Sequence, residues 1–327
     1  MTAPTANPDR PTQSVNLLNV VTPFAAAGTT IAATLTFAAF AARYHWRLEQ
    51  ACHFRVQYFW SLLLAAVVLR AAKRPRIAAL ALIASLTNLA VIAPIYWPTQ
   101  SPNNTGPKLR VISFNLLRDN PEHAAVTQFL RHEQADIVLL MEVTPEWATV
   151  IETLGDVYPH QKIVSRSDAF GIALISRHAW DECQAIDIGA DDLPTLVAYF
   201  RVDEAPFIFI ATHPLPPGSR TTAQERNFQL AALGRFARQA SAATILVGDL
   251  NITDFSPYFG DLLRVSGFRD SRQGRGVQAS WGPLVGVEIP IDHCLVSPTI
   301  AVRNRHIGPH LGSDHRPVVV DLCLPHH

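Results

Sequence analysis

The sequence predicts a layered α/β domain in residues 109–327 that is preceded by three apolar helices in residues 17–98. Two observations carry this prediction. The first hundred residues contain three long apolar runs, each with few or no charges. After them, short β-rich runs alternate with helical stretches as far as the C-terminus, which is the pattern of helices layered against sheets.

Composition limits the classes of function. The chain has 327 residues, enough for two domains, and its formal net charge is +0. No global basic field therefore exists to attract nucleic acid, and any polyanion would have to bind locally. The four cysteines form no Cys-x-x-Cys pair, which argues against a zinc ribbon and against a disulfide scaffold. A single Cys294–Cys323 bridge stays open.

The N-terminal region is expected to cross a membrane. Residues 1–16 are polar, contain three prolines and are predicted to form a disordered tail. The first apolar run, 17–42, has 26 uncharged residues, whereas a spanning helix needs about 20. Further runs cover 56–69, extended by the long side chain of Arg70, and 77–97. Three such runs disfavour both a buried hairpin of a soluble domain and a cleaved signal peptide.

The basic residues predict the orientation. The tail and the segment between the second and third runs carry five Lys and Arg residues, and the segment between the first and second runs carries three. Basic segments favour the cytoplasmic side. We therefore expect a multi-pass membrane protein with its N-terminus inside and its C-terminal domain on the extracytoplasmic side.

A turn-rich linker, residues 99–108, leads into the α/β region. Thr221 or Thr222 is a plausible cap for the longest predicted helix. We predict helices over 121–133, 145–154 and 223–239, and strands over 110–114, 137–140, 172–175, 196–201, 207–211, 244–247, 291–296 and 318–322.

Polar side chains occur where the predicted strands begin or end. The segments are VISFN, DIVLLME, IFIATH, TILVGDLN, IDHCLV and LGSDHRP. Because residues at strand ends can converge on one rim of a sheet, we expect these side chains to surround one cleft. They are Asn115, Glu142, His213, Asp249, Asn251, Asp292, Asp314 and His315.

These residue types suit metal-assisted chemistry on phosphate. Taken singly, Glu142 has the alternative of a cap or ion-pair partner, and His213 that of a structural histidine. A metal-free turn could likewise explain GDLN or SDHRP alone, but not all six segments together. Asp, Glu and Asn oxygens favour Mg²⁺ or Mn²⁺ over Zn²⁺, and such an ion neutralises phosphate oxygens. A histidine held by a buried carboxylate can take or orient a water proton.

The order N…E…H…GDxN…D…SDH resembles the endonuclease/exonuclease/phosphatase superfamily, over about Lys108 to Pro325. That group includes pancreatic-type DNases, class II apurinic endonucleases, sphingomyelinases and inositol polyphosphate 5-phosphatases. The segments THPLPP and IDHCLVS look most like its membrane-associated bacterial branch. The resemblance implies a four-layer sandwich, with two packed β-sheets flanked by helices.

The resemblance also implies roles for the residues that match its motifs. The metal would be bound by Asn115, Glu142 and Asp314. Asp249 and Asn251 would position the water and the phosphate, Asp292 would orient His315, and His213 would stabilise the pentacovalent transition state. Either Asp249 or His315 could be the base.

The segment before Asp292 departs from the family's frequent Arg-Ile-Asp form, because Pro290 stands in place of the arginine. Arg220 and Arg226 are candidate replacements for a phosphate contact. A solvated helix face explains these two arginines equally well.

Four functions are compared. A phosphoesterase could act on nucleic acid as a nuclease, or on a lipid head group or small phosphate ester. The apolar runs and the neutral charge favour the second. A non-catalytic membrane interaction protein is disfavoured by the complete residue set, and a transporter by spans without evident charged or broken helices. The partners expected are the phosphate ester and the lipid bilayer, with no obligate protein partner.

Overall fold

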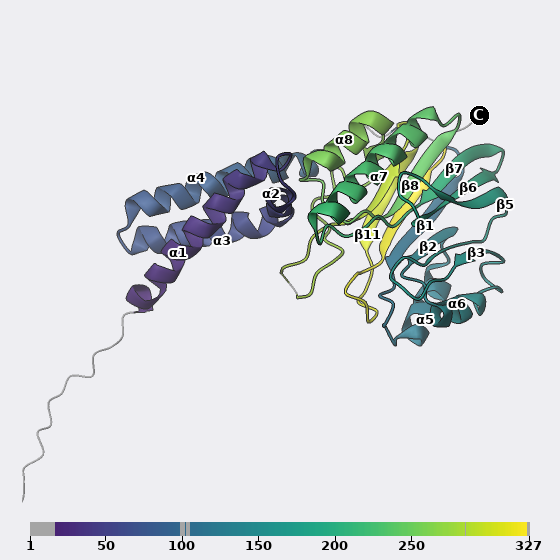
Figure 1. Cartoon of the computed structure of the whole chain (residues 1–327), viewed down its shortest axis with the longest axis horizontal. Coiled ribbons are helices and arrows are strands. Elements are labelled where there is room, and N and C mark those ends of the chain that lie inside the picture. Colours follow the sequence, from purple (N-terminus) through teal and green to yellow (C-terminus); the bar gives the residue numbers. More distant parts are fainter. Residues whose placement is uncertain (1–16, 99–101, 103–104, 285, 326–327) are drawn as a thin grey trace, which may run out of the picture.

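The computed structural model describes residues 17–98, 102, 105–284 and 286–325. A bundle of helices lies against one end of an α/β sandwich (Figure 1). The predicted tail, residues 1–16, lies outside the described residues. So do residues 99–101 and 103–104 of the predicted linker.

Three helices of the bundle are long and apolar enough to cross a membrane. They cover Leu17–Ala41, Trp46–Ala71 and Pro75–Tyr96, and their main α-helices are α1 (Leu17–Ala38), α3 (Arg55–Ala71) and α4 (Pro75–Ile92). Large apolar side chains cover the outside of the bundle, as at Phe24 and Leu64, which are 75% and 67% exposed. Water would not stabilise such a surface, whereas lipid tails would.

The connection between α1 and α3 is helical rather than an open loop. It consists of the 3₁₀ turn Ala39–Ala41, the short helix α2 (Trp46–Gln50) and the 3₁₀ turn Ala51–Phe54. Further short helical structure, Ala93–Tyr96, follows α4.

Arg55, which was counted from the sequence in the segment between the first two apolar runs, is the first residue of α3 and lies inside the bundle. Its guanidinium donates to the carbonyl of Thr36 at 3.0 Å and to the side chain of Asn88 at 3.2 Å. Asn88 donates in turn to the Thr36 hydroxyl at 2.8 Å. These hydrogen bonds join α1, α3 and α4 in the interior of the bundle.

Two six-stranded sheets form the sandwich. The first has the order β11-β12-β1-β2-β4-β3 and the second β5-β6-β7-β8-β10-β9. The first sheet comprises β1 (Lys108–Asn115), β2 (Ile137–Met141), β3 (His160–Val164), β4 (Ile172–Ser176), β11 (Ala301–Ile307) and β12 (Val318–Cys323). The second comprises β5 (Trp180–Asp187), β6 (Pro194–Val202), β7 (Ala205–Ala211), β8 (Ala243–Asp249), β9 (Arg269–Asp270) and β10 (Asp292–Val296).

Helices cover the outer faces of the sheets. One cluster of buried side chains, including Val111, Phe209 and Val247, fills the space between the two sheets. A second cluster packs α5 (His123–Glu133) and α6 (Pro145–Glu152) on the first sheet. A third packs α7 (Arg220–Gln239) and α8 (Pro257–Ser266) on the second sheet. The predicted four-layer sandwich is therefore confirmed.

The structure corrects one detail of the sequence interpretation, the cap of α7, and decides a second that the sequence left open, the pairing of Cys294 with Cys323. Ser219 caps α7, because its hydroxyl accepts the backbone N–H of Thr222 at 3.1 Å; neither Thr221 nor Thr222 is the cap. Cys294 and Cys323 form no disulfide with each other. Their strands, β10 and β12, belong to different sheets.

Candidate active site

All eight residues singled out from the sequence belong to segments at one edge of the sandwich. β1 runs parallel to β2, and β7 runs parallel to β8, so the carboxyl ends of these central strands share that edge. Asn115 and Asp249 end β1 and β8, and Glu142 and His213 follow β2 and β7. The antiparallel strands β10 and β12 begin at the same edge, where Asp292 and the Asp314–His315 pair lie.

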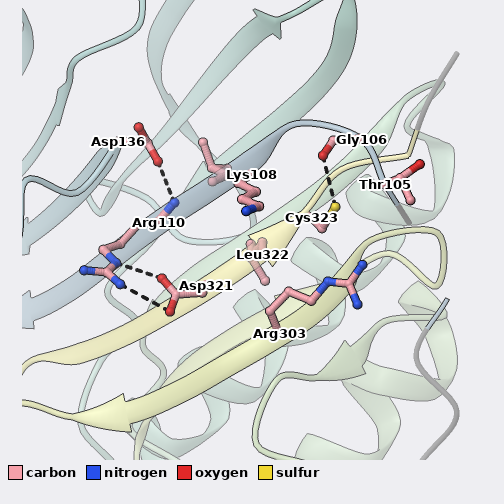
Figure 2. A pocket seen from close by; sticks show the side chains of 10 residues that line it. Thr105, Gly106, Lys108, Arg110, Asp136, Arg303, Asp321, Leu322 and Cys323 are labelled. Atoms are coloured by element: carbon pink, nitrogen blue, oxygen red, sulfur yellow. Dashed lines mark hydrogen bonds and ion pairs between the residues drawn. The ribbon is translucent and has the colours of Figure 1, made fainter. Parts of the chain in front are cut away.

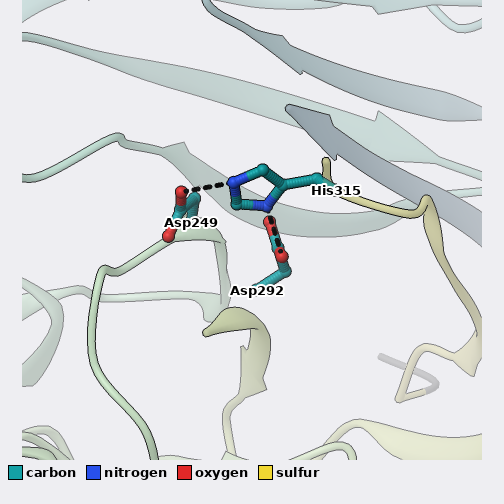
Figure 3. A group of neighbouring side chains, drawn as sticks. All are labelled: Asp249, Asp292 and His315. Carbon is teal, nitrogen blue, oxygen red and sulfur yellow. Dashed lines mark hydrogen bonds and ion pairs between the residues drawn. The ribbon is translucent and has the colours of Figure 1, made fainter. Parts of the chain in front are cut away.

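His315 lies between two carboxylates (Figure 3). Its Nδ1 is 2.9 Å from Asp292 Oδ2, and its Nε2 is 3.5 Å from Asp249 Oδ2. Each residue offers one potential metal-ligating atom, and these three atoms lie within 4.8 Å of one another. All three side chains are buried, so water screens their interactions poorly.

The local backbone explains this arrangement. Asp292 and Asp249 are direct partners in the antiparallel pair of β10 and β8, which places their side chains on the same face. A Cβ at Gly248 would lie 1.9 Å from the carbonyl oxygen of Thr212. Only glycine therefore permits the ends of β7 and β8 to approach so closely, bringing Nε2 of His213 to 3.6 Å from Asp249 Oδ2.

The buried charges shift proton affinities in opposite directions. Burial favours the neutral imidazole, but the carboxylates of Asp292 and Asp249 outweigh it and raise the pKa of His315 to about 9. Burial also opposes ionisation of Asp249, yet His315 and His213 hold the pKa of that carboxyl below its usual value. At neutral pH the pair is therefore an imidazolium beside a carboxylate.

Asn115 joins Glu142 to this group. Its Nδ2 is 3.1 Å from Glu142 Oε1 and 3.4 Å from Asp249 Oδ2. Glu142 Oε2 accepts the backbone N–H of Arg118 at 3.1 Å. Glu142 has a φ of 60°, in the left-handed region that a long side chain rarely occupies. Such strain concentrates at functional sites, because the surroundings must hold the residue in place.

Asn251 is also in the left-handed region, with a φ of 50°. Its backbone N–H donates to Asp249 Oδ1 at 2.9 Å, and its Nδ2 donates to the carbonyl of Pro214 at 2.9 Å. The carboxamide is thus fixed between the segments that carry Asp249 and His213.

Asp314 is held by a residue that the sequence did not indicate. Trp281 Nε1 donates to Asp314 Oδ2 at 2.8 Å, and Trp281 forms an isolated β-bridge with His315. The charge of Asp314 also contributes to the raised pKa of His315. The Ser313 hydroxyl, likewise missed, donates to the carbonyl of Asn115 at 2.8 Å. A tryptophan in a Pro- and Gly-rich segment gives no pattern from which its partner could be predicted.

The donor set fits a divalent cation. Among the described residues, no lysine or arginine forms an ion pair with the side chains of Glu142, Asp249 or Asp292. Asp292 Oδ1 is buried and has no hydrogen-bond partner within the described part of the chain. His315 compensates Asp249 and Asp292, but Glu142 has no cationic partner among the described residues, and carboxylate oxygens of this kind suit Mg²⁺ or Mn²⁺.

The cavity shown in Figure 2 lies away from these residues. Its volume is about 790 Å³, and it is lined by the start of β1 and the end of β12, at Lys108 and Cys323. Arg110 beside it already pairs with Asp321 at 2.7 Å and with Glu133 at 3.3 Å. This cavity is therefore lined by none of the eight residues singled out from the sequence.

Arg226 is not an exposed phosphate contact, as one interpretation of the sequence suggested. It is 0% exposed and forms an ion pair with Glu49. The alternative of a solvated helix face is equally wrong for Arg226, because the helix turns this residue toward the bundle. Arg220, the first residue of α7, is exposed.

Comparison with known proteins gives the same fold and family. The sequence model of the Endonuclease/Exonuclease/phosphatase family matches residues 112–315, more than half of the chain. A comparison with curated protein sequences found no match.

Three solved structures are similar in fold. TDP2 of D. rerio complexed with single strand DNA product is 17% identical, with a TM-score of 0.56 over 66% of this chain and 98% of that one. The 3' phosphatase NExo of Neisseria, bound to a product DNA hairpin, is 20% identical, with a TM-score of 0.54 over 65% and 98%. An endonuclease/exonuclease/phosphatase from Beutenbergia cavernae is 22% identical, with a TM-score of 0.53 over 67% and 72%.

The resemblance seen in the motifs is thus confirmed by the family match and by the fold. The chain belongs to the endonuclease/exonuclease/phosphatase family of metal-dependent phosphoester hydrolases.

Proposed function

We propose that this protein is a membrane-anchored phosphoesterase that acts on a lipid head group or a small phosphate ester. The observation that carries the catalytic part is the buried group of Asp249, Asp292 and His315 beside Asn115 and Glu142. The three apolar helices support the anchor.

A cavity of about 810 Å³ supports the choice of substrate. It is lined partly by Phe170, whose ring centroid is 5.6 Å from that of His213. Its other lining residues include Asp187, Asp191 and Glu225, and its one arginine, Arg166, is already paired with two aspartates. An acidic wall repels a nucleic-acid strand, whereas a small or lipid ester brings only one phosphate.

In the proposed mechanism, a divalent ion would be held by Asn115, Glu142 and Asp314, and it would supply neutralisation of the charge on the phosphate oxygens. Asp249, being ionised, accepts the proton of the attacking water. His315, kept protonated by Asp292, donates a hydrogen bond to a phosphate oxygen. Asn251 orients the phosphate, and His213 donates to the charge that develops in the transition state. As the water oxygen bonds to phosphorus, the P–O bond to the alcohol breaks. The leaving alkoxide takes a proton from solvent, to which Asp249 returns the one it accepted.

A substrate panel tests this proposal. The full-length protein in detergent, with Mg²⁺ or Mn²⁺, is offered a phospholipid, a small aryl phosphodiester and single-stranded DNA. We expect hydrolysis of one of the first two, and a loss of at least about 100-fold in Asp249→Asn, which keeps the side-chain shape but removes the base. Preferential cleavage of DNA would refute the substrate choice, and no hydrolysis of any ester would refute the function.

We also propose the division of the chain into a tail (1–16), a membrane bundle (17–98), a linker (99–108) and a catalytic domain (109–327), with this domain on the extracytoplasmic side. The orientation is inferred from the excess of Lys and Arg residues at the end of the bundle that lies away from the catalytic domain, because basic segments favour the cytoplasmic side. Reporter fusions after Pro107 are expected to be active only when the reporter requires export. A fusion active in the cytoplasm would reverse the orientation without affecting the anchor.

A further inference from the structure

The bundle and the catalytic domain are joined by a buried ion pair. Glu49, on α2, lies between the first two apolar helices, and Arg226 is on α7 of the sandwich (Figure 1). Nη2 of Arg226 is 2.7 Å and 2.6 Å from the two carboxylate oxygens of Glu49. The two side chains are only 1% and 0% exposed.

Both partners of this pair also reach the catalytic loop that follows β8. Nη1 of Arg226 donates to the carbonyl of Asn251 at 2.6 Å. Glu49 Oε1 accepts the hydroxyl of Ser256 at 2.7 Å. Between these two points, His53 Nδ1 is 2.9 Å from the hydroxyl of Thr253. The bundle therefore contacts the middle and the end of the segment 251–256 directly, and it reaches the start of the segment through Arg226.

A second loop beside the site is held from the same helical segment. Gln50 donates to the carbonyl of Pro217 at 2.7 Å. Pro217 closes the THPLPP segment that begins next to His213. The segments that carry His213 and Asn251 thus both rest on residues 49–53.

Stability alone does not account for this ion pair. Burying two charges costs so much hydration that apolar residues of similar volume often replace such a pair with no loss of stability. Apolar residues could not, however, replace the hydrogen bond that Arg226 donates to the carbonyl of Asn251. Asn251 has a left-handed backbone, which has to be held in place. A displacement of about 1 Å at a reacting group can reduce the rate about 100-fold.

We propose that Glu49 is a positioning residue of the active site, acting through Arg226 on the backbone of Asn251, so that the membrane bundle is part of the catalytic machinery. The expected effect on kcat rests on the proposed function. The expected effect on the order of residues 250–256 does not, because it concerns the structure alone.

The test separates positioning from stability. Glu49→Gln alone leaves the Arg226 charge buried without a counter-charge and is expected to destabilise the fold. The informative variant is therefore the double substitution Glu49→Leu with Arg226→Met, which removes both charges and keeps the volume. The matched control is Arg43→Ala, which breaks another ion pair across the same interface, with Asp261 of α8 at 2.7 Å. Arg43 is largely exposed.

Three quantities are measured on the full-length proteins in detergent: the thermal midpoint, kcat and KM on the hydrolysed ester, and backbone hydrogen exchange. We expect the double variant to keep the midpoint of the wild type, to lose about 10- to 100-fold in kcat and to change KM by less than about threefold. The protected amides of Leu250 and Ser256 should exchange faster. Arg43→Ala should change none of these.

A double variant with normal kcat and normal exchange in 250–256 would overturn the inference, since the pair would then be structural only. If the wild type hydrolyses no ester, the proposed function fails separately. The exchange measurement still decides the positioning, because it needs no substrate.

Discussion

Removal of divalent metal is expected to abolish hydrolysis by the full-length protein. The oxygen atoms of Asn115, Glu142 and Asp314 form the proposed ligand set, and the described part of the chain supplies no arginine or lysine ion pair to Glu142 or Asp314. Stabilisation of transition-state charge by a metal is worth several kcal/mol, so we expect a loss of about 1,000-fold or more with excess chelator. Mg²⁺ or Mn²⁺ should restore the rate.

A matched variant locates the ion. Glu142→Gln keeps the shape of the side chain but removes one anionic ligand. It should therefore require a higher metal concentration for activity, and Mn²⁺ should raise its thermal midpoint less than that of the wild type. Full activity in excess chelator, with no metal found by elemental analysis, would exclude the metal-dependent reaction. An unchanged metal requirement in Glu142→Gln would place the ion elsewhere.

The buried strands could be predicted from the sequence, and several edge strands could not. Continuous apolar runs such as Ile137–Met141 belong to the middle of a sheet, where both faces are covered. β5, Trp180–Asp187, lies at the edge of the second sheet, and most of its side chains are exposed or only half-buried. It therefore lacks a buried face that would leave a pattern. β3 and β11 are also edge strands that the sequence missed. The side chains of β3 are all half-buried, whereas β11 buries Ala301, Val302 and Arg305 but has no regular alternation of buried and exposed residues.

Some residues of the candidate site could likewise be predicted from the sequence, and others could not. Residues at the ends of apolar strands, such as Asn115 and Asp249, could be found because the strand marks their place on the sheet. Glu49 could not, because its partner Arg226 is far away in the sequence and only the packing of α2 on α7 brings them together. One signal was available: Glu49 is the single acidic residue between the first two apolar runs, among three arginines. Nothing in the sequence indicates which residue it pairs with.

Alanine substitutions of His315 and Asp292 are expected to act on one step and not to add. Asp292 Oδ2 is 2.9 Å from Nδ1 of His315, so the carboxylate fixes the ring orientation and keeps the proton on that nitrogen. It also raises the pKa of His315. The other nitrogen, Nε2, is left facing Asp249 and the proposed phosphate position.

A positioned hydrogen-bond donor to the phosphate is worth about 100- to 1,000-fold, and His315→Ala should lose most of that factor. Asp292→Ala should lose part of it, because the ring remains but is neither oriented nor kept charged. In the double variant the carboxylate has no imidazole left to hold, so its kcat/KM should be close to that of His315→Ala. The measurement is kcat/KM of both single variants and the double variant, on one ester at saturating Mg²⁺, with thermal midpoints to confirm folding. If the two losses instead multiply, the residues act independently, and the 2.9 Å contact orients nothing that the reaction uses.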